Sequence, residues 1–132
     1  MAGIARTSIS AGNVIHSALS SDETVAAGVT AIYPVVEPVE AQCPYIAYRR
    51  VSLSANPQKA GQPGADTIQI EVDCYTSDYE EGLDLAEAVR ACLDYRSHEA
   101  EGLRMRSCFL SSSSESIDGD AFVQQLIFTI KI

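Results

Sequence analysis

Hydrophobic and polar residues alternate regularly from Thr67 to Thr76, and the pattern then changes to a helical spacing. The apolar positions of the first part are Ile68, Ile70, Val72 and Cys74. Their two-residue period predicts a strand with one buried face. After Ser77, apolar residues recur every three or four positions as far as Leu93, which is typical of an amphipathic helix. Ser77 and Glu80 have the spacing of a capping box, so Ser77 is predicted to be the N-cap of this helix.

Two helices and an edge strand are predicted before this unit. The first helix covers roughly Ser8 to Leu19, where apolar residues follow the helical period. Ser20 and Glu23 form a second capping box, which opens a short helical segment that Gly28 can end. Residues 29–36 are predicted to form a short strand at a sheet edge, because the proline within it cannot donate a ladder hydrogen bond.

The remaining apolar segments predict strands at 45–53, 103–110 and 121–132. A polar linker at 54–66 and the serine-rich segment 111–120 are predicted to be loops at opposite ends of one sheet. Strand 103–110 should run in the same direction as 67–76, through a right-handed crossover. We therefore expect one α+β domain covering residues 1–132. Its mixed, mostly antiparallel sheet of four to five strands should carry two helices on one face.

Charge limits the possible partners. The chain of 132 residues has a net charge of -9, and no lysine or arginine lies between Lys59 and Arg90. The carboxylates in that interval are Asp66, Glu71, Asp73, Asp78, Glu80, Glu81, Asp84 and Glu87. Such a surface repels phosphate, so direct nucleic-acid binding is not expected. It is either a solvated helix face or a face that meets a basic partner.

Neither membrane insertion nor export is expected. No apolar run approaches the roughly 18 residues that span a bilayer, and the N-terminus lacks both the basic cluster and the apolar core of a signal peptide. A bacterial or phage-infected cytoplasm is the expected compartment.

No motif for catalysis, metal binding or cofactor binding is apparent. The four cysteines are too far apart for a zinc site, and neither His16 nor His98 has a neighbour at ligand spacing. Glu71 and Asp73 project from one face of the same strand, and a metal-dependent hydrolase could use such a cluster. Polar positions on the outer face of an antiparallel sheet explain the two residues more simply. We expect no enzymatic activity and no cofactor.

Several strings, in this order and spacing, resemble the tail terminator (tail completion) proteins of long-tailed phages and prophages. The strings are residues 31–34 (AIYP), 44–48 (PYIAY), 70–76 (IEVDCYT) and 85–90 (LAEAVR). The resemblance spans roughly Val14 to Ile132. The long GQPG-containing linker and the serine-rich final loop depart from it.

The resemblance implies a structural protein that forms a ring, typically a homohexamer, on the head-proximal end of the tail tube. The implied partners are the chain itself, the tail tube protein and the head-completion or connector proteins. The implied location is the virion tail, with assembly in the host bacterial cytoplasm.

A ring needs two different patches on each subunit. The candidate subunit or partner interface pairs an acidic helix face with arginines: Arg49, Arg50, Glu80, Glu81, Asp84, Glu87, Arg104 and Arg106. The candidate partner-facing loop residues are Asn56, Lys59, Gln62, Ser113, Glu115 and Asp118. The alternative function is a small ligand-binding or regulatory domain of ferredoxin-like α+β architecture.

Overall fold

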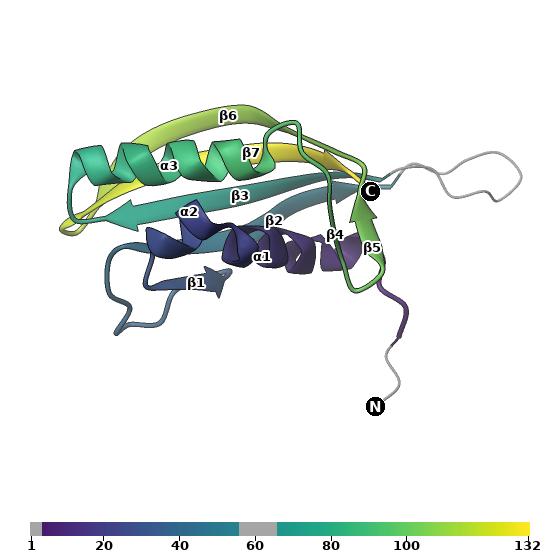
Figure 1. The fold of residues 1–132 in the computed structure, drawn as a ribbon, viewed down its shortest axis with the longest axis horizontal. Helices are drawn as coiled ribbons and strands as arrows, with labels where there is room; N and C mark the ends of the chain where they lie inside the picture. The colour runs from purple at the N-terminus through teal and green to yellow at the C-terminus, as the bar shows by residue number, and fades with distance from the viewer. Residues whose placement is uncertain (1–3, 56–65) are drawn as a thin grey trace, which may run out of the picture.

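The computed structural model describes residues 4–55 and 66–132 as helices packed on one face of a five-stranded sheet (Figure 1). The strand order is β1-β2-β3-β7-β6, and β4 and β5 form a separate small hairpin. In chain order the elements are η1 Ser8–Ser10, α1 Ala11–Ser21, α2 Glu23–Ala27, β1 Ala31–Pro34, β2 Tyr45–Ser54, β3 Thr67–Thr76, α3 Tyr79–Leu93, β4 His98–Ala100, β5 Leu103–Met105, β6 Ser107–Asp118 and β7 Ala121–Lys131.

The predicted α+β class is confirmed, as is the mostly antiparallel sheet. Among the described strands the only parallel pair is formed by β1 and β2, and β1 is an edge strand as predicted from its proline. The β4–β5 hairpin was not predicted. None of the described helices is long and apolar enough to cross a bilayer.

The core lies between the helices and one face of the sheet. Ile68, Ile70, Val72 and Cys74 of β3 all point toward the helices and are fully buried, as their alternation predicted. Helices α1 and α3 supply the opposing layer through Ile15, Leu19, Val89 and Leu93 among others. Burying this apolar surface is the main driving force for the fold.

Both predicted N-caps are wrong by one or two residues. Helix α1 continues through Ser20, whose hydroxyl bonds back to the His16 carbonyl, so α2 is capped by Asp22 instead. In α3 the N-cap is Asp78, whose carboxylate accepts from the Glu81 N–H at 3.0 Å. In each case a nearby aspartate has the extended backbone that an N-cap requires, and its carboxylate reaches the third residue along.

Replacing Asp78 with alanine should lower the free energy of unfolding by about 1 kcal/mol, because it leaves the Glu81 N–H without its cap. The change is measured by urea denaturation. Ser77→Ala is the matched control and should shift stability by less than about 0.5 kcal/mol. A larger loss for Ser77→Ala than for Asp78→Ala would contradict the assignment of the cap.

The serine-rich segment is a strand, so the predicted loop at 111–120 is wrong. Strand β6 continues to Asp118 and pairs with β7 along its length, leaving a two-residue turn at Gly119 and Asp120. Gly119 has φ 61°, which glycine adopts readily. The alternation of apolar and polar residues did not predict this part of the strand, because β6 is an exposed edge strand. Its side chains can be polar on both faces. The predicted direction is right, since β3 and β6 both run antiparallel to β7, which lies between them.

Candidate assembly surfaces

The face of the sheet that points away from the helices carries an aromatic row at one end. Tyr45 and Tyr75 are cross-strand partners whose rings stack with centroids 4.6 Å apart, and Tyr33 packs edge-on against Tyr45 at 5.8 Å. Such contacts add to the stability that area burial gives. Burial raises the pKa of Tyr75 to about 12, with the charge of Glu37 contributing. The stacked pair therefore remains neutral and structural at physiological pH.

A carboxyl pair lies in the middle of the same face, flanked by an arginine. Glu71 is only 7% exposed, and its carboxylate is 3.1 Å from the Arg49 guanidinium. Burial opposes ionisation of Glu71, but hydrogen bonds from Asp73 and Arg49 outweigh it and hold its pKa below the usual range. For Asp73, burial and the neighbouring Glu71 raise the pKa to about 7. The pair thus shares one proton over much of the acidic pH range.

The groups around the pair come from the same chain. Within the described parts of the chain, no group of three or more His, Cys, Asp or Glu side chains could hold a metal ion. The cation that neutralises Glu71 is Arg49 of the same chain. Asp73 Oδ1 is buried, and no described residue donates a hydrogen bond to it. The arrangement can hold a proton between the two carboxyl groups.

The Asp73 carboxyl should make stability depend on pH in a defined direction. Its folded pKa of about 7 lies above the value of about 3.9 in unfolded chains, so the folded chain holds a proton that the unfolded chain releases. The stability that this bound proton gives the folded chain is fully present below about pH 4 and is lost as the pH rises through about 7. Asp73→Asn stays neutral, so its melting temperature relative to wild type should be higher at about pH 8.5 than at about pH 5. A difference that does not change with pH would contradict this.

Charged side chains are unevenly distributed along the long axis of the molecule, with acidic residues at one end and most basic residues at the other. We call the end with the β6–β7 turn the hairpin end, on the left of Figure 1, and the opposite end, where the first described residues and the C-terminus lie, the terminal end. Residues 36–44, 77–82 and 115–122 form the hairpin end and contain no lysine or arginine. Their carboxylates are Glu37, Glu40, Asp78, Glu80, Glu81, Glu115, Asp118 and Asp120.

The terminal end carries most of the described cations: Arg6, Arg50, Arg96, Arg104, Arg106 and Lys131. Its described carboxylates are Asp66, Asp94, Glu99 and Glu101, and three of the four are engaged within the chain. Glu101 pairs with Arg6, Asp94 pairs with Arg90, and Asp66 accepts from the Ser8 hydroxyl. Opposite charge at opposite ends suits a head-to-tail contact between different patches.

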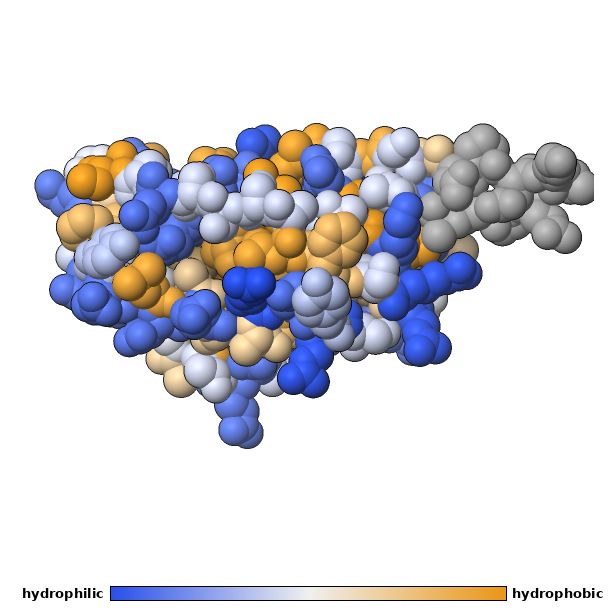
Figure 2. Space-filling view, turned by 90° about the horizontal axis from the view of Figure 1, so that it is seen from above, coloured by the Kyte–Doolittle hydropathy of each residue, from blue (hydrophilic) through white to orange (hydrophobic). Residues whose placement is uncertain are grey.

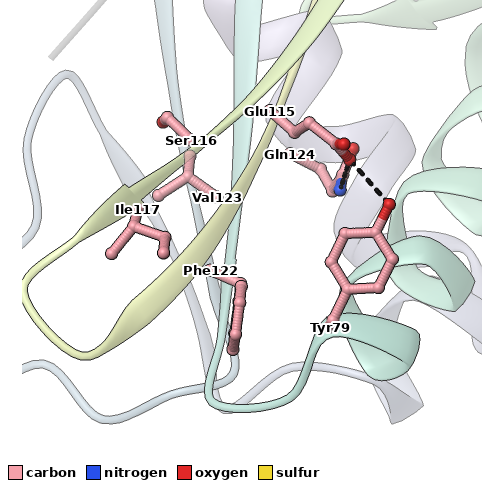
Figure 3. Close-up of a pocket in the computed structure, with 7 residues that line it drawn as sticks. All are labelled: Tyr79, Glu115, Ser116, Ile117, Phe122, Val123 and Gln124. Atoms are coloured by element: carbon pink, nitrogen blue, oxygen red, sulfur yellow. Dashed lines mark hydrogen bonds between the residues drawn. The ribbon is translucent and has the colours of Figure 1, made fainter.

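A groove of about 380 Å³ lies at the hairpin end, between β6–β7 and the start of α3 (Figure 3). Ile117 and Phe122 of the hairpin and the Tyr79 ring supply its apolar surface. At its rim, the Glu115 carboxylate accepts from the Tyr79 hydroxyl at 3.0 Å and from the Gln124 amide at 2.8 Å. These hydrogen bonds lower the pKa of Glu115 and keep the rim negatively charged. Figure 2 shows apolar groups among hydrophilic ones at this end, on the left.

The predicted interface residues are divided between these surfaces. Arg49 lies on the open face, bound to Glu71, while Arg50 donates to the Ile9 carbonyl at 2.6 Å. Both arginines therefore already have partners within the chain. The structure does not test whether any of the predicted residues contacts another subunit.

The acidic and basic members of the predicted pair are far apart within one chain. Glu80 and Glu81 lie in the first turn of α3 at the hairpin end, and Asp84 and Glu87 follow on its exposed surface. Arg104 and Arg106 line a depression at the terminal end together with Ile132. A contact between these two groups would have to join two different copies.

Two of the predicted loop positions, Glu115 and Asp118, lie at the hairpin end, and Ser113 lies farther along the same exposed strand. Asn56, Lys59 and Gln62 fall outside the described residues. Sequence reasoning missed the groove, because it placed residues 111–120 in a loop and treated Tyr79 only as a helix residue. A hairpin signal was present in Gly119-Asp120, since a Gly-Asp pair between two strand segments favours a two-residue turn.

The chain is similar to known proteins in both sequence and fold. A family model described as "Tail completion protein gp17" matches residues 13–132. A chain from the virion of a native gene transfer agent particle superposes with a TM-score of 0.77 at 18% identity, covering 90% of this chain and 91% of that one. A second solved structure has a TM-score of 0.60 at 11% identity, covering 92% and 96%. No curated protein matches the sequence. At these identities the structural matches establish the fold alone.

Proposed function

The chain belongs to the tail completion protein gp17 family, and we propose that within this family it acts as a tail terminator. In this role, copies of the chain form a ring, a homohexamer, on the head-proximal end of the tail tube. The ring stops polymerisation of the tube and presents a surface to the head-completion proteins. The protein assembles in the host cytoplasm and remains in the virion tail.

The opposite charge of the two ends is the observation that best supports this proposal. A ring is built from heterologous contacts, in which one patch meets a different patch on the next subunit. An acidic hairpin end and a basic terminal end on one chain meet that requirement. The role needs no catalytic centre. Glu71 and Asp73 share a proton on the sheet face that the helices leave uncovered.

The acidic surface of α3 is the proposed counterpart of Arg104 and Arg106 on the neighbour. Reversing the charge of Glu81 and Asp84 together should weaken ring formation, because exposed ion pairs each contribute about 0.2–1 kcal/mol. Native mass spectrometry of the assembled ring measures this. An unchanged oligomer population would show that these two groups do not pair.

Labelling of intact particles tests the proposed position. An antibody against the chain should bind at one site per tail, at the junction with the head, in electron micrographs of purified particles. Label along the whole tail, at the distal tip, or absent from particles would contradict the proposed role.

A further inference from the structure

We propose that the N-terminal segment of one copy, residues 4–7, binds in the hairpin-end groove of the next copy, with Ile4 in the groove and Arg6 against Glu115. The inference rests on the proposed ring and identifies a further contact between neighbouring copies in it. The occupant is therefore a second copy of this chain.

The groove has the chemistry to receive an apolar side chain followed by a cation. Ile117 is 67% exposed and Tyr79 is 40% exposed, which leaves a substantial apolar surface uncovered in the single chain. Phe122 packs edge-on against Tyr79, with ring centroids 6.0 Å apart. The Glu115 carboxylate stands at the rim, held by Tyr79 and Gln124 (Figure 3). The surrounding surface is acidic, so the groove favours a basic partner over an acidic one.

The N-terminal segment matches this arrangement. Residues 4–7 are exposed and form neither helix nor strand, and Ile4 is 87% exposed. In an extended chain, Ile4 and Arg6 point to the same side and lie about 7 Å apart. Ile9 follows at the start of the helical region and is also largely exposed. Segment 4–7 therefore presents one large apolar side chain with an arginine beside it, and Ile9 adds a second just beyond the segment.

Charge complementarity and position fit a second copy of the chain. The segment lies at the basic terminal end and the groove lies at the acidic hairpin end, so no single chain can join them (Figure 1). Within the described part of one chain, Arg6 forms only an ion pair of 3.3 Å with Glu101, in which both side chains are about half exposed. Such a pair is weak and can be exchanged for a new one. Repeating this contact around an axis produces a ring when the rotation between neighbouring copies closes.

Cysteine cross-linking provides the test. The variant Ile4→Cys/Ile117→Cys is made in a Cys43→Ala background, because Cys74, Cys92 and Cys108 are buried. Tails are purified from particle-producing cells, oxidised mildly and run on a non-reducing gel. A head-to-tail contact should give a ladder of covalent oligomers that extends beyond the dimer. The matched control is Ile4→Cys/Tyr95→Cys, since Tyr95 is 84% exposed but follows α3 at the terminal end, so it should give no ladder.

Charge exchange gives a second readout that needs no cysteine. Arg6→Glu and Glu115→Arg should each weaken ring association about two- to fivefold, and the double variant should recover most of the loss. Tails that contain the double-cysteine protein but yield no ladder, or a ladder equal to that of the control, would overturn this contact and leave the terminator role intact. Tails that lack the wild-type protein as well would overturn both.

Discussion

Replacing Phe128 with alanine should lower the free energy of unfolding by about 3–5 kcal/mol, because it removes the largest fully buried side chain of the described core. Phe128 lies on β7 and faces the helices opposite Ile70 of β3. Its removal would leave a cavity in the middle of the core, which the surrounding sheet can only partly fill. Denaturant unfolding followed by circular dichroism measures the change.

Phe109 provides the matched control, because its replacement removes the same side chain from an exposed position. It lies on the edge strand β6 and is 40% exposed. Phe109→Ala should therefore cost much less, about 1 kcal/mol or below. If the two alanine variants lost equal stability, the assignment of the core to the helix-covered face would be wrong.

The second large effect is expected at Gly82, in the first turns of α3. A Cβ at this position would lie 2.8 Å from the Thr76 hydroxyl oxygen, which is buried and donates to the Asp78 carbonyl at 2.7 Å. Either α3 must move away from β3 or this hydrogen bond must break. Gly82→Ala should therefore destabilise the fold by about 1–3 kcal/mol, although alanine has the higher helix propensity.

A double-mutant cycle isolates the contact with Thr76. If crowding is the cause, Gly82→Ala should cost clearly less in a Thr76→Ala background, because the oxygen that the new Cβ meets is absent. Glu87→Ala, on the exposed face of the same helix, is the control and should change stability by less than about 0.5 kcal/mol. A stabilising Gly82→Ala would show that α3 and β3 leave room for a side chain at this position.

Elements in which apolar residues recur at a regular spacing could be predicted from sequence, and elements without such a spacing could not. Alternation across Ile68, Ile70, Val72 and Cys74 correctly identified β3 and its buried face, because that strand is central and covered on one side. The serine-rich part of β6 has no alternation, since its side chains lie at an exposed edge. Local signals also placed the N-cap of α3 at Ser77, one residue before Asp78, which forms the cap.

The candidate surfaces were harder to predict, because they join segments that are distant in sequence. Pairing of Arg49 with Glu71 depends on the β2–β3 register, which no local pattern specifies. The groove combines Tyr79 of α3 with Ile117 and Phe122 of the β6–β7 hairpin. The family resemblance was nevertheless visible in short strings, and the family model that matches residues 13–132 confirms it.

Electron microscopy of particles assembled without this protein tests the terminator role most directly. Cells that lack only this gene should produce filled heads and separate tails, and the tails should vary widely in length, because nothing stops the tube or joins it to the head. Supplying the chain in trans should restore joined particles with uniform tails. Normal tailed particles in the absence of the gene would contradict the terminator role.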